Sequence, residues 1–146
     1  MKNLFILISS ILVSFSLYAS DLTPDQVPSD VQNTITKNYK NIRDLSWEKD
    51  GRNYQAEFKV DLKEYEVIMN EKGKILAVYQ DIFINELPDK VRKTIQSNYS
   101  NYKIEDVEYL KVKSIDYYKI ELESSDGEMK IFINSKGEIV KAPLIK

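Results

Sequence analysis

The sequence predicts an α+β fold in which one α-β-β-β-β unit occurs twice in tandem, forming an antiparallel sheet with helices packed on one face. Residues 27–42, VPSDVQNTITKNYKNI, align with residues 87–102, LPDKVRKTIQSNYSNY, at an offset of 60. Each segment is followed by short runs of alternating apolar and polar residues, as half-buried strands require. The turns NEKGKI and NSKGEI near the end of each half match at an offset of 64. We therefore expect an N-terminal segment, residues 1–19, and two units, residues 20–84 and 85–146.

Each unit is predicted to begin with one amphipathic helix. Apolar residues recur at every fourth position of both aligned segments, which places them in one stripe along a helix. The stripes are Val27, Val31, Ile35 and Tyr39 in the first unit and Leu87, Val91, Ile95 and Tyr99 in the second. Pro28 and Pro88 suit the first helical turn, where a missing N–H costs nothing.

Four strands are predicted after each helix. They cover residues 43–49, 53–60, 64–70 and 74–80, and then residues 104–112, 117–124, 128–134 and 138–142. The offset between the halves changes from 60 to 64 within the first hairpin, so we expect its loop to be four residues longer in the second unit. Gly73 and Gly137 are predicted to close the last hairpin of each unit, with a positive φ that glycine tolerates.

Residues 1–19 have the layout of a secretory signal peptide. Lys2 precedes an apolar run from Leu4 to Tyr18, and cleavage is expected after Ala19. The run is shorter than the ~20 residues that span a bilayer as a helix. The chain has no cysteine that could carry an N-terminal lipid. We expect a periplasmic or secreted protein with no stable membrane anchor after signal cleavage.

The composition excludes several classes of function. The chain has no histidine and no cysteine, so it lacks the commonest general base, every thiol nucleophile and the usual zinc ligands. We expect no catalysis, no cofactor and no metal site. An enzyme using serine, lysine and acids would require a serine hydroxyl beside a buried lysine. The net charge of −2 and the lack of a basic run argue against nucleic acid as a partner.

Alternation along the strands predicts which side chains face the helices. The helix-facing set is Leu45, Trp47, Tyr54, Ala56, Phe58, Val60, Tyr65, Val67, Met69, Ile75, Ala77 and Tyr79, with Tyr118, Ile120, Leu122, Met129, Ile131, Ile133 and Ile139 in the second unit. The opposite positions are polar, at Glu48, Gln55, Glu57, Lys59, Lys119, Glu121 and Lys130. One side of the sheet should therefore be open to solvent.

Two pairs of apolar residues interrupt this polar pattern at repeat-equivalent positions. They are Ile68 with Leu76, and Phe132 with Val140. They predict an exposed apolar strip on the open side, and such strips often bind partners. The alternative is that residues 20–27 or a loop covers the strip.

The helix starts VPSDVQNTI and LPDKVRKTI, the segment LSWEKDGRNYQAEF and the two glycine turns resemble the PepSY-like, β-lactamase-inhibitor-like family of periplasmic proteins. The resemblance covers nearly all of the chain after residue 19. It implies two helix-on-sheet units that share one continuous sheet, whose open face can meet another protein. It also implies an inhibitor-like role.

These observations predict a non-catalytic binding protein whose partner is another exported protein. The expected contact residues are Ile68, Leu76, Phe132, Val140 and Tyr117. The alternative is a small molecule or envelope component bound in a groove between the units, with the segment 110–118, including Tyr117, as one wall.

Overall fold

The computed structural model describes residues 20–145, so the predicted signal peptide lies outside the described residues. These residues form one nine-stranded antiparallel sheet in which every strand pairs with the next along the chain. The strands are β1 (Ser20–Leu22), β2 (Arg43–Asp50), β3 (Asn53–Val60), β4 (Lys63–Asn70), β5 (Ile75–Asp81), β6 (Lys103–Val112), β7 (Ile115–Ser124), β8 (Gly127–Asn134) and β9 (Ile139–Val140). The helices are α1 (Ser29–Asn38) and α2 (Asp89–Asn98), each preceded by a short 3-10 turn, Pro24–Gln26 or Ile84–Glu86. Neither helix is long and apolar enough to cross a membrane, a statement that covers residues 20–145 alone.

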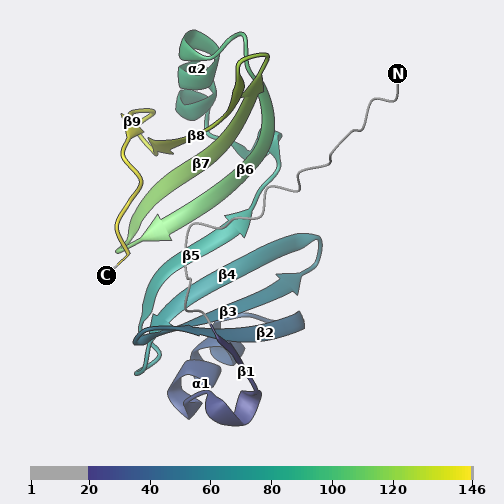
Figure 1. Cartoon of the computed structure of the whole chain (residues 1–146), viewed down its shortest axis with the longest axis vertical. Helices are drawn as coiled ribbons and strands as arrows, with labels where there is room; N and C mark the ends of the chain where they lie inside the picture. Colours follow the sequence, from purple (N-terminus) through teal and green to yellow (C-terminus); the bar gives the residue numbers. More distant parts are fainter. Residues whose placement is uncertain (1–19, 146) are drawn as a thin grey trace.

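The pairing of β5 with β6 joins the two units into one sheet. It runs from Ala77 opposite Val112 to Asp81 opposite Glu108. In Figure 1, α1 lies at one end of the molecule and α2 at the other, with β5 between the two halves. The predicted α+β fold with a tandem repeat is confirmed.

Each unit has its own core between its helix and one face of the sheet. In the first unit, Val31 and Ile35 of α1 are buried with Trp47, Tyr54, Ala56, Phe58, Val67 and Met69. In the second, Val91 and Ile95 of α2 are buried with Val107, Ile120, Leu122, Ile131 and Ile133. Burial of each large apolar side chain stabilises the fold by about 1.5–3 kcal/mol. Most predicted helix-facing residues therefore occupy these cores. Four of them remain between 36% and 46% exposed, namely Leu45, Ile75, Met129 and Ile139.

A β-bulge at Leu76 reverses the expected orientation of the rest of β5. Ile68 lies opposite Ala77, whereas the next residue, Met69, lies opposite Ile75, so Leu76 is one residue in excess on β5. As a result Ala77 and Tyr79 lie on the open side of the sheet, where they pack with Ile68. The prediction that Ala77 and Tyr79 face the helices was wrong. Leu76 is the excess residue of the bulge and lies opposite no residue of β4, so it does not pair with Ile68.

The extra residues of the second unit lengthen strands rather than a loop. The turns of both first hairpins are two residues long, Gly51-Arg52 and Lys113-Ser114. However, β6 and β7 each have 10 residues, whereas β2 and β3 each have 8. Lys113 and Ser114 both have positive φ, as a tight type I′ turn requires. The predicted four-residue loop insertion was therefore wrong in its location.

The repeated glycine turns pack against the helices. Gly73 and Gly137 have φ of +71° and +86°. The Thr34 hydroxyl of α1 donates a hydrogen bond to the carbonyl of Gly73 (2.9 Å), and Thr94 of α2 does the same to Gly137 (2.6 Å). The glycines are therefore needed for close approach to a helix as well as for the turn itself.

Alanine substitutions should separate these two requirements. A Cβ at Gly73 would lie 2.5 Å from the carbonyl oxygen of Asp30, one at Gly137 would lie 3.0 Å from that of Lys90, and one at Gly51 would meet no atom within 4 Å. We expect losses in the free energy of unfolding of about 3 kcal/mol or more for Gly73→Ala, an intermediate loss for Gly137→Ala, and about 1–2 kcal/mol for Gly51→Ala, which keeps only the backbone strain. Urea denaturation measures all three. Equal losses would show that contact with the helix is unimportant.

Candidate functional site: the open face of the sheet

The candidate site is the side of the sheet that faces away from α1 and α2, called here the open face. Strand register places side chains from seven strands in continuous rows across it. One row runs through Ser46, Glu57, Glu66, Tyr79, Leu110, Tyr117 and Asn134, and a neighbouring row through Asp81, Glu108, Lys119, Phe132 and Val140. The rows bring polar residues of the first unit next to apolar residues of the second.

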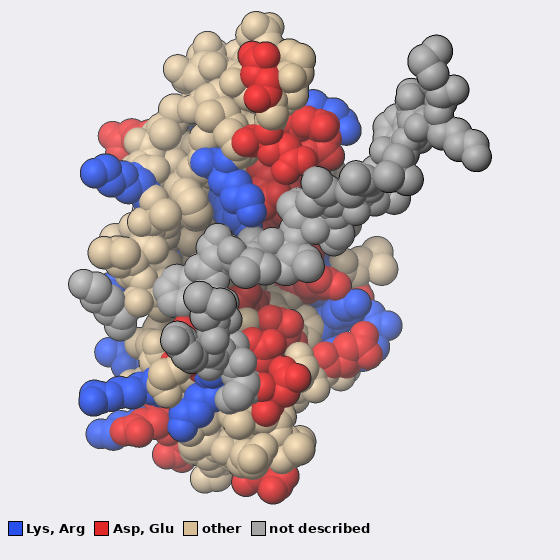
Figure 2. Space-filling view, viewed as in Figure 1, with Lys and Arg blue, Asp and Glu red and all other residues tan. Residues whose placement is uncertain are grey.

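A hollow of about 610 Å³ lies over β2 to β6 on this face and is lined mainly by acids. We call it the acidic hollow; its carboxylates are Asp44, Glu48, Glu57, Glu64, Glu66, Asp81 and Glu108. Figure 2 shows acidic side chains gathered along the middle of the molecule, from one unit into the other. Among the described residues of the lining, Lys59 alone is basic, and its ammonium lies 3.0 Å from Glu64.

Glu66 carries the strongest electrostatic conflict in the hollow. It lies directly opposite Glu57 on the neighbouring strand, and like charges in that position repel. Burial, and then the charges of Glu57, Glu108 and Glu48, raise the pKa of Glu66 to about 7. No ion pair involves Glu66 within residues 20–145.

The pKa values of two neighbouring groups, Asp81 and Tyr79, are raised as well. Burial, followed by the charges of Asp106 and Glu108, raises the pKa of Asp81 to about 6. Burial and the nearby carboxylates Glu66 and Glu108 raise the pKa of Tyr79 to about 12, so its hydroxyl stays protonated. The hollow therefore holds more negative charge than its own cations offset.

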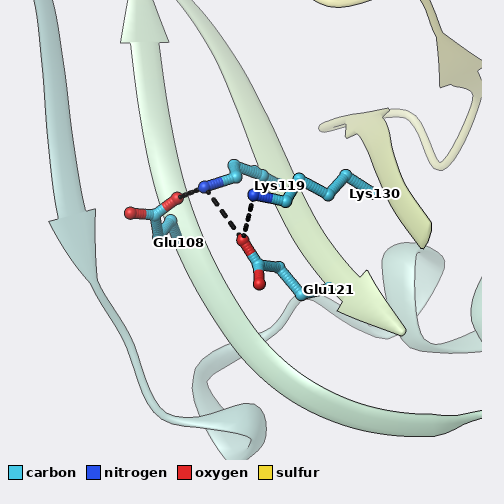
Figure 3. Close-up of polar contacts among 4 residues, drawn as sticks. All are labelled: Glu108, Lys119, Glu121 and Lys130. Atoms are coloured by element: carbon cyan, nitrogen blue, oxygen red, sulfur yellow. Dashed lines mark hydrogen bonds and ion pairs between the residues drawn. The ribbon is translucent and has the colours of Figure 1, made fainter. Parts of the chain in front are cut away.

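An ion-pair network with a buried centre at Glu108 and Lys119 forms the border of the hollow in the second unit (Figure 3). The ammonium of Lys119 lies 2.5 Å from Glu108 and 3.3 Å from Glu121, and Lys130 lies 3.0 Å from Glu121. Partial burial raises the pKa of Glu121, but the hydrogen bonds and charges of Lys130 and Lys119 outweigh it, so that pKa is lowered overall. Lys119 is thus occupied by carboxylates, and no serine hydroxyl is among its hydrogen-bond partners in the described part of the chain.

An apolar patch adjoins the acidic hollow. Its buried members are Ala77, Leu110 and Val112, and Ile68, Tyr79, Tyr117, Phe132 and Ile145 pack around them. Tyr79 belongs to the patch and also lines the hollow, so it joins the two surfaces.

The structure brings together most of the residues predicted for partner contact. Ile68, Tyr117 and Phe132 share the apolar patch, and Val140 lies opposite Phe132 on β9. Leu76 is the excess residue of the bulge and is not a member of the patch. Residues 20–27, one of the two alternative covers, do not lie over the strip, because β1 pairs beside β2 at the sheet edge and Leu22 and Val27 pack in the first core. Ile145 near the C-terminus packs on the patch instead.

Sequence reasoning missed both the floor of the patch and the acidic hollow. Leu110 and Val112 alternate with Lys111, a signal that assigns them to one face. Alternation assigned Glu48 and Glu57 to the open side, and the same rule could have assigned Glu66 to it. Tyr117 does not line the hollow, so the predicted wall at residues 110–118 is not part of it.

Comparisons with known proteins agree with this fold. A model of the family described as "Putative beta-lactamase-inhibitor-like, PepSY-like" matches residues 16–77 and again residues 77–141. A DUF2874 family protein from Bacteroides uniformis is similar to this chain with a TM-score of 0.72 and 21% identity, covering 79% of this chain and 87% of that one. A BLIP-like protein from Bacteroides fragilis gives a TM-score of 0.67 and 24% identity over 77% and 83% of the two chains.

A third solved structure, described as a putative periplasmic protein from Bacteroides eggerthii, gives a TM-score of 0.72 and 18% identity over 79% of this chain and 86% of that one. At these identities the similarity concerns the fold alone. No curated protein matches the chain.

Neutralising Glu66 should stabilise the protein above neutral pH. The folded protein holds the Glu66 proton up to about pH 7, whereas an unfolded chain releases it near pH 4.5. The free energy of unfolding should therefore fall as pH rises between these values, and Glu66→Gln should remove that loss. We expect the variant to be more stable by about 1–3 kcal/mol at pH 8 and no more stable at pH 4.

Urea denaturation at several pH values tests this expectation. Glu71→Gln makes the same charge change at an exposed turn residue outside the hollow and serves as the control. A stability gain at pH 8 of equal size in both variants would reflect net charge rather than the environment of Glu66.

Proposed function

The chain belongs to the PepSY-like family, which its two units match in tandem, and from this premise we propose that it is an exported, non-catalytic protein that binds a basic segment of another envelope or secreted protein on its open face. The observation that carries the proposal is the placement of Glu66 opposite Glu57, without an ion pair to Glu66 in the described residues, beside an apolar patch. A lysine or arginine of a partner would offset this charge, while its aliphatic stem packs on apolar surface.

The expected location follows from two supporting observations. The N-terminal sequence has the layout of a signal peptide, and a structural neighbour from Bacteroides eggerthii is described as a "putative periplasmic" protein. Binding in that compartment would hold or modulate the partner, as the inhibitor-like description of the family suggests.

Sheet geometry favours an extended partner over a compact one. Tyr79 links the acidic hollow to the apolar patch, so a single segment could contact both. Its basic residues would lie over Glu57 and Glu66, and apolar residues would reach Ile68, Tyr117 and Phe132. Electrostatic complementarity of this kind also raises the rate of encounter.

A second candidate is a small cationic molecule or envelope component held in the hollow alone. The volume of about 610 Å³ lies within the range of ligand-binding pockets and supports this possibility. Such pockets are mostly apolar, however, whereas this lining is rich in carboxylates. The two candidates differ in whether the apolar patch is needed.

Peptide selection tests the main proposal. Random peptides displayed on phage are selected on immobilised residues 20–146, and an enriched peptide is measured by titration calorimetry. We expect enriched peptides to combine lysine or arginine with aliphatic or aromatic residues. Glu57→Lys should weaken their binding about tenfold or more, because it places a cation in the hollow, and Glu71→Lys should not.

The outcomes separate the candidates. If enriched peptides show no basic bias, or if both lysine variants bind equally well, the proposal is wrong. Spermidine and cadaverine serve as probes for the second candidate. That candidate gains support if they raise the melting temperature of wild type and of Tyr117→Ser alike, but not of Glu57→Lys.

Binding of a basic peptide should also depend on pH. The pKa values of Glu66 and Asp81, about 7 and about 6, imply that both carboxyls are largely protonated at pH 5. Affinity should therefore rise between pH 5 and pH 8, and this rise should shrink in Glu66→Gln. Titrations in buffers of different ionisation enthalpy would detect the released protons. Constant affinity over this range would exclude Glu66 and Asp81 as contacts.

A further inference from the structure

The outer edge of β8 lacks the strand that its counterpart in the first unit possesses. At the 64-residue offset, Glu128, Met129 and Lys130 correspond to Glu64, Tyr65 and Glu66 of β4. Tyr65 and Glu66 are paired with β5. In the second unit β9 pairs only with Phe132 and Ile133, and no other strand within residues 20–145 lies beside residues 127–131.

The main-chain groups of this edge point outward. Asn134 donates its N–H to the carbonyl of Glu138 on the β9 side, at 2.9 Å. Main-chain direction alternates along an antiparallel strand, so the N–H and C=O groups of Glu128 and Lys130 face the same side, while those of Met129 face β7. All three residues are exposed, and Met129 is 37% exposed.

The side chains along this edge are complementary to themselves. If a second copy pairs in antiparallel fashion about a two-fold axis at Met129, each Glu128 lies opposite Lys130 of the other copy. These are the residues whose main-chain groups point outward, so each pair would exchange both of its main-chain hydrogen bonds. The two exposed methionines would meet at the axis.

An electrostatic conflict in the single chain favours the same pairing. Glu128 lies directly opposite Glu123 of β7, so two carboxylates face each other. The pKa of Glu123 is raised, first by the hydrogen bond and charge of Glu105 and further by Glu128. A lysine from a second copy would place a cation beside Glu128, where its own chain places an anion.

We propose that the edge of β8 at residues 127–131 is a self-association surface through which two copies of the chain form a symmetric dimer with one continuous sheet. The contact is short, because β9 occupies the edge of β8 at Phe132 and Ile133. It is smaller than the roughly 1,600 Å² of a standard interface, so the dimer is weak, with a dissociation constant on the order of 100 μM. The open face of each copy stays accessible, and the pairing closes a sheet edge that could otherwise pair with other chains.

Charge reversal tests the predicted register. Glu128→Lys and Lys130→Glu each place like charges opposite each other in a homodimer, and each should weaken self-association about tenfold. An equimolar mixture of the two variants restores opposite charges at both positions, so the mixture should associate about as well as wild type. Sedimentation equilibrium of residues 20–146, from about 10 μM to about 1 mM, measures all of these states.

A variant of the main chain provides an independent test. Glu128→Pro removes an outward-facing N–H and leaves the hydrogen bonds to β7 in place, so it should reduce association while the melting temperature stays near that of wild type. The proposal is overturned if wild type remains monomeric up to about 1 mM, if the mixed variants associate no better than either alone, or if Glu128→Pro associates like wild type.

Discussion

The bulge at Leu76 determines which side chains of β5 lie on the open face, and the rest of the candidate site depends on it. One excess residue on β5 places Ala77 and Tyr79 on the side away from the helices. Without it, Leu76 would lie beside Ile68 and Tyr79 would lie in a helix-covered core. The tyrosine could then neither pack with Leu110 nor border Glu66. The second unit has no such bulge, so Phe132 and Val140 keep the pairing that simple alternation gives.

This bulge also explains which features of the fold and of the open face could be predicted from the sequence alone. The repeat, both helices and all the long strands could be predicted, because they depend on periodicity within one segment. The open-face positions of Ile68, Phe132 and Val140 followed from the same periodicity. Leu76 did not, because a bulge is a property of the register between β4 and β5 rather than of either strand. The opposition of Glu57 and Glu66 also required the register, and the contact of Ile145 with the patch required the path of the C-terminal segment.

The open face combines two environments that affect stability in opposite ways. The apolar patch buries Leu110 and Val112 and so contributes to the fold. The acidic hollow places carboxylates where burial and mutual repulsion favour their protonated forms, which works against the fold at neutral pH. Local conflict of this kind is common at sites of function, where stability elsewhere in the structure compensates for it. Here the two cores under α1 and α2 provide that compensation.

The longer hairpin of β6 and β7 allows the second unit to pair fully with the last strand of the first. Its additional length carries Lys111 and Val112 alongside Val78 and Ala77, where β6 is joined to the preceding unit. A strict copy of the first unit, with β6 ending at the position equivalent to Asp50, would stop at Leu110 and leave Ala77 and Val78 without partners. Growth of the sheet by whole repeats therefore needs a lengthened first hairpin in every unit after the first. It also needs a full-length last strand in every unit that is to pair with a following one, and the two-residue β9 is too short for the five-residue pairing that β5 makes with β6.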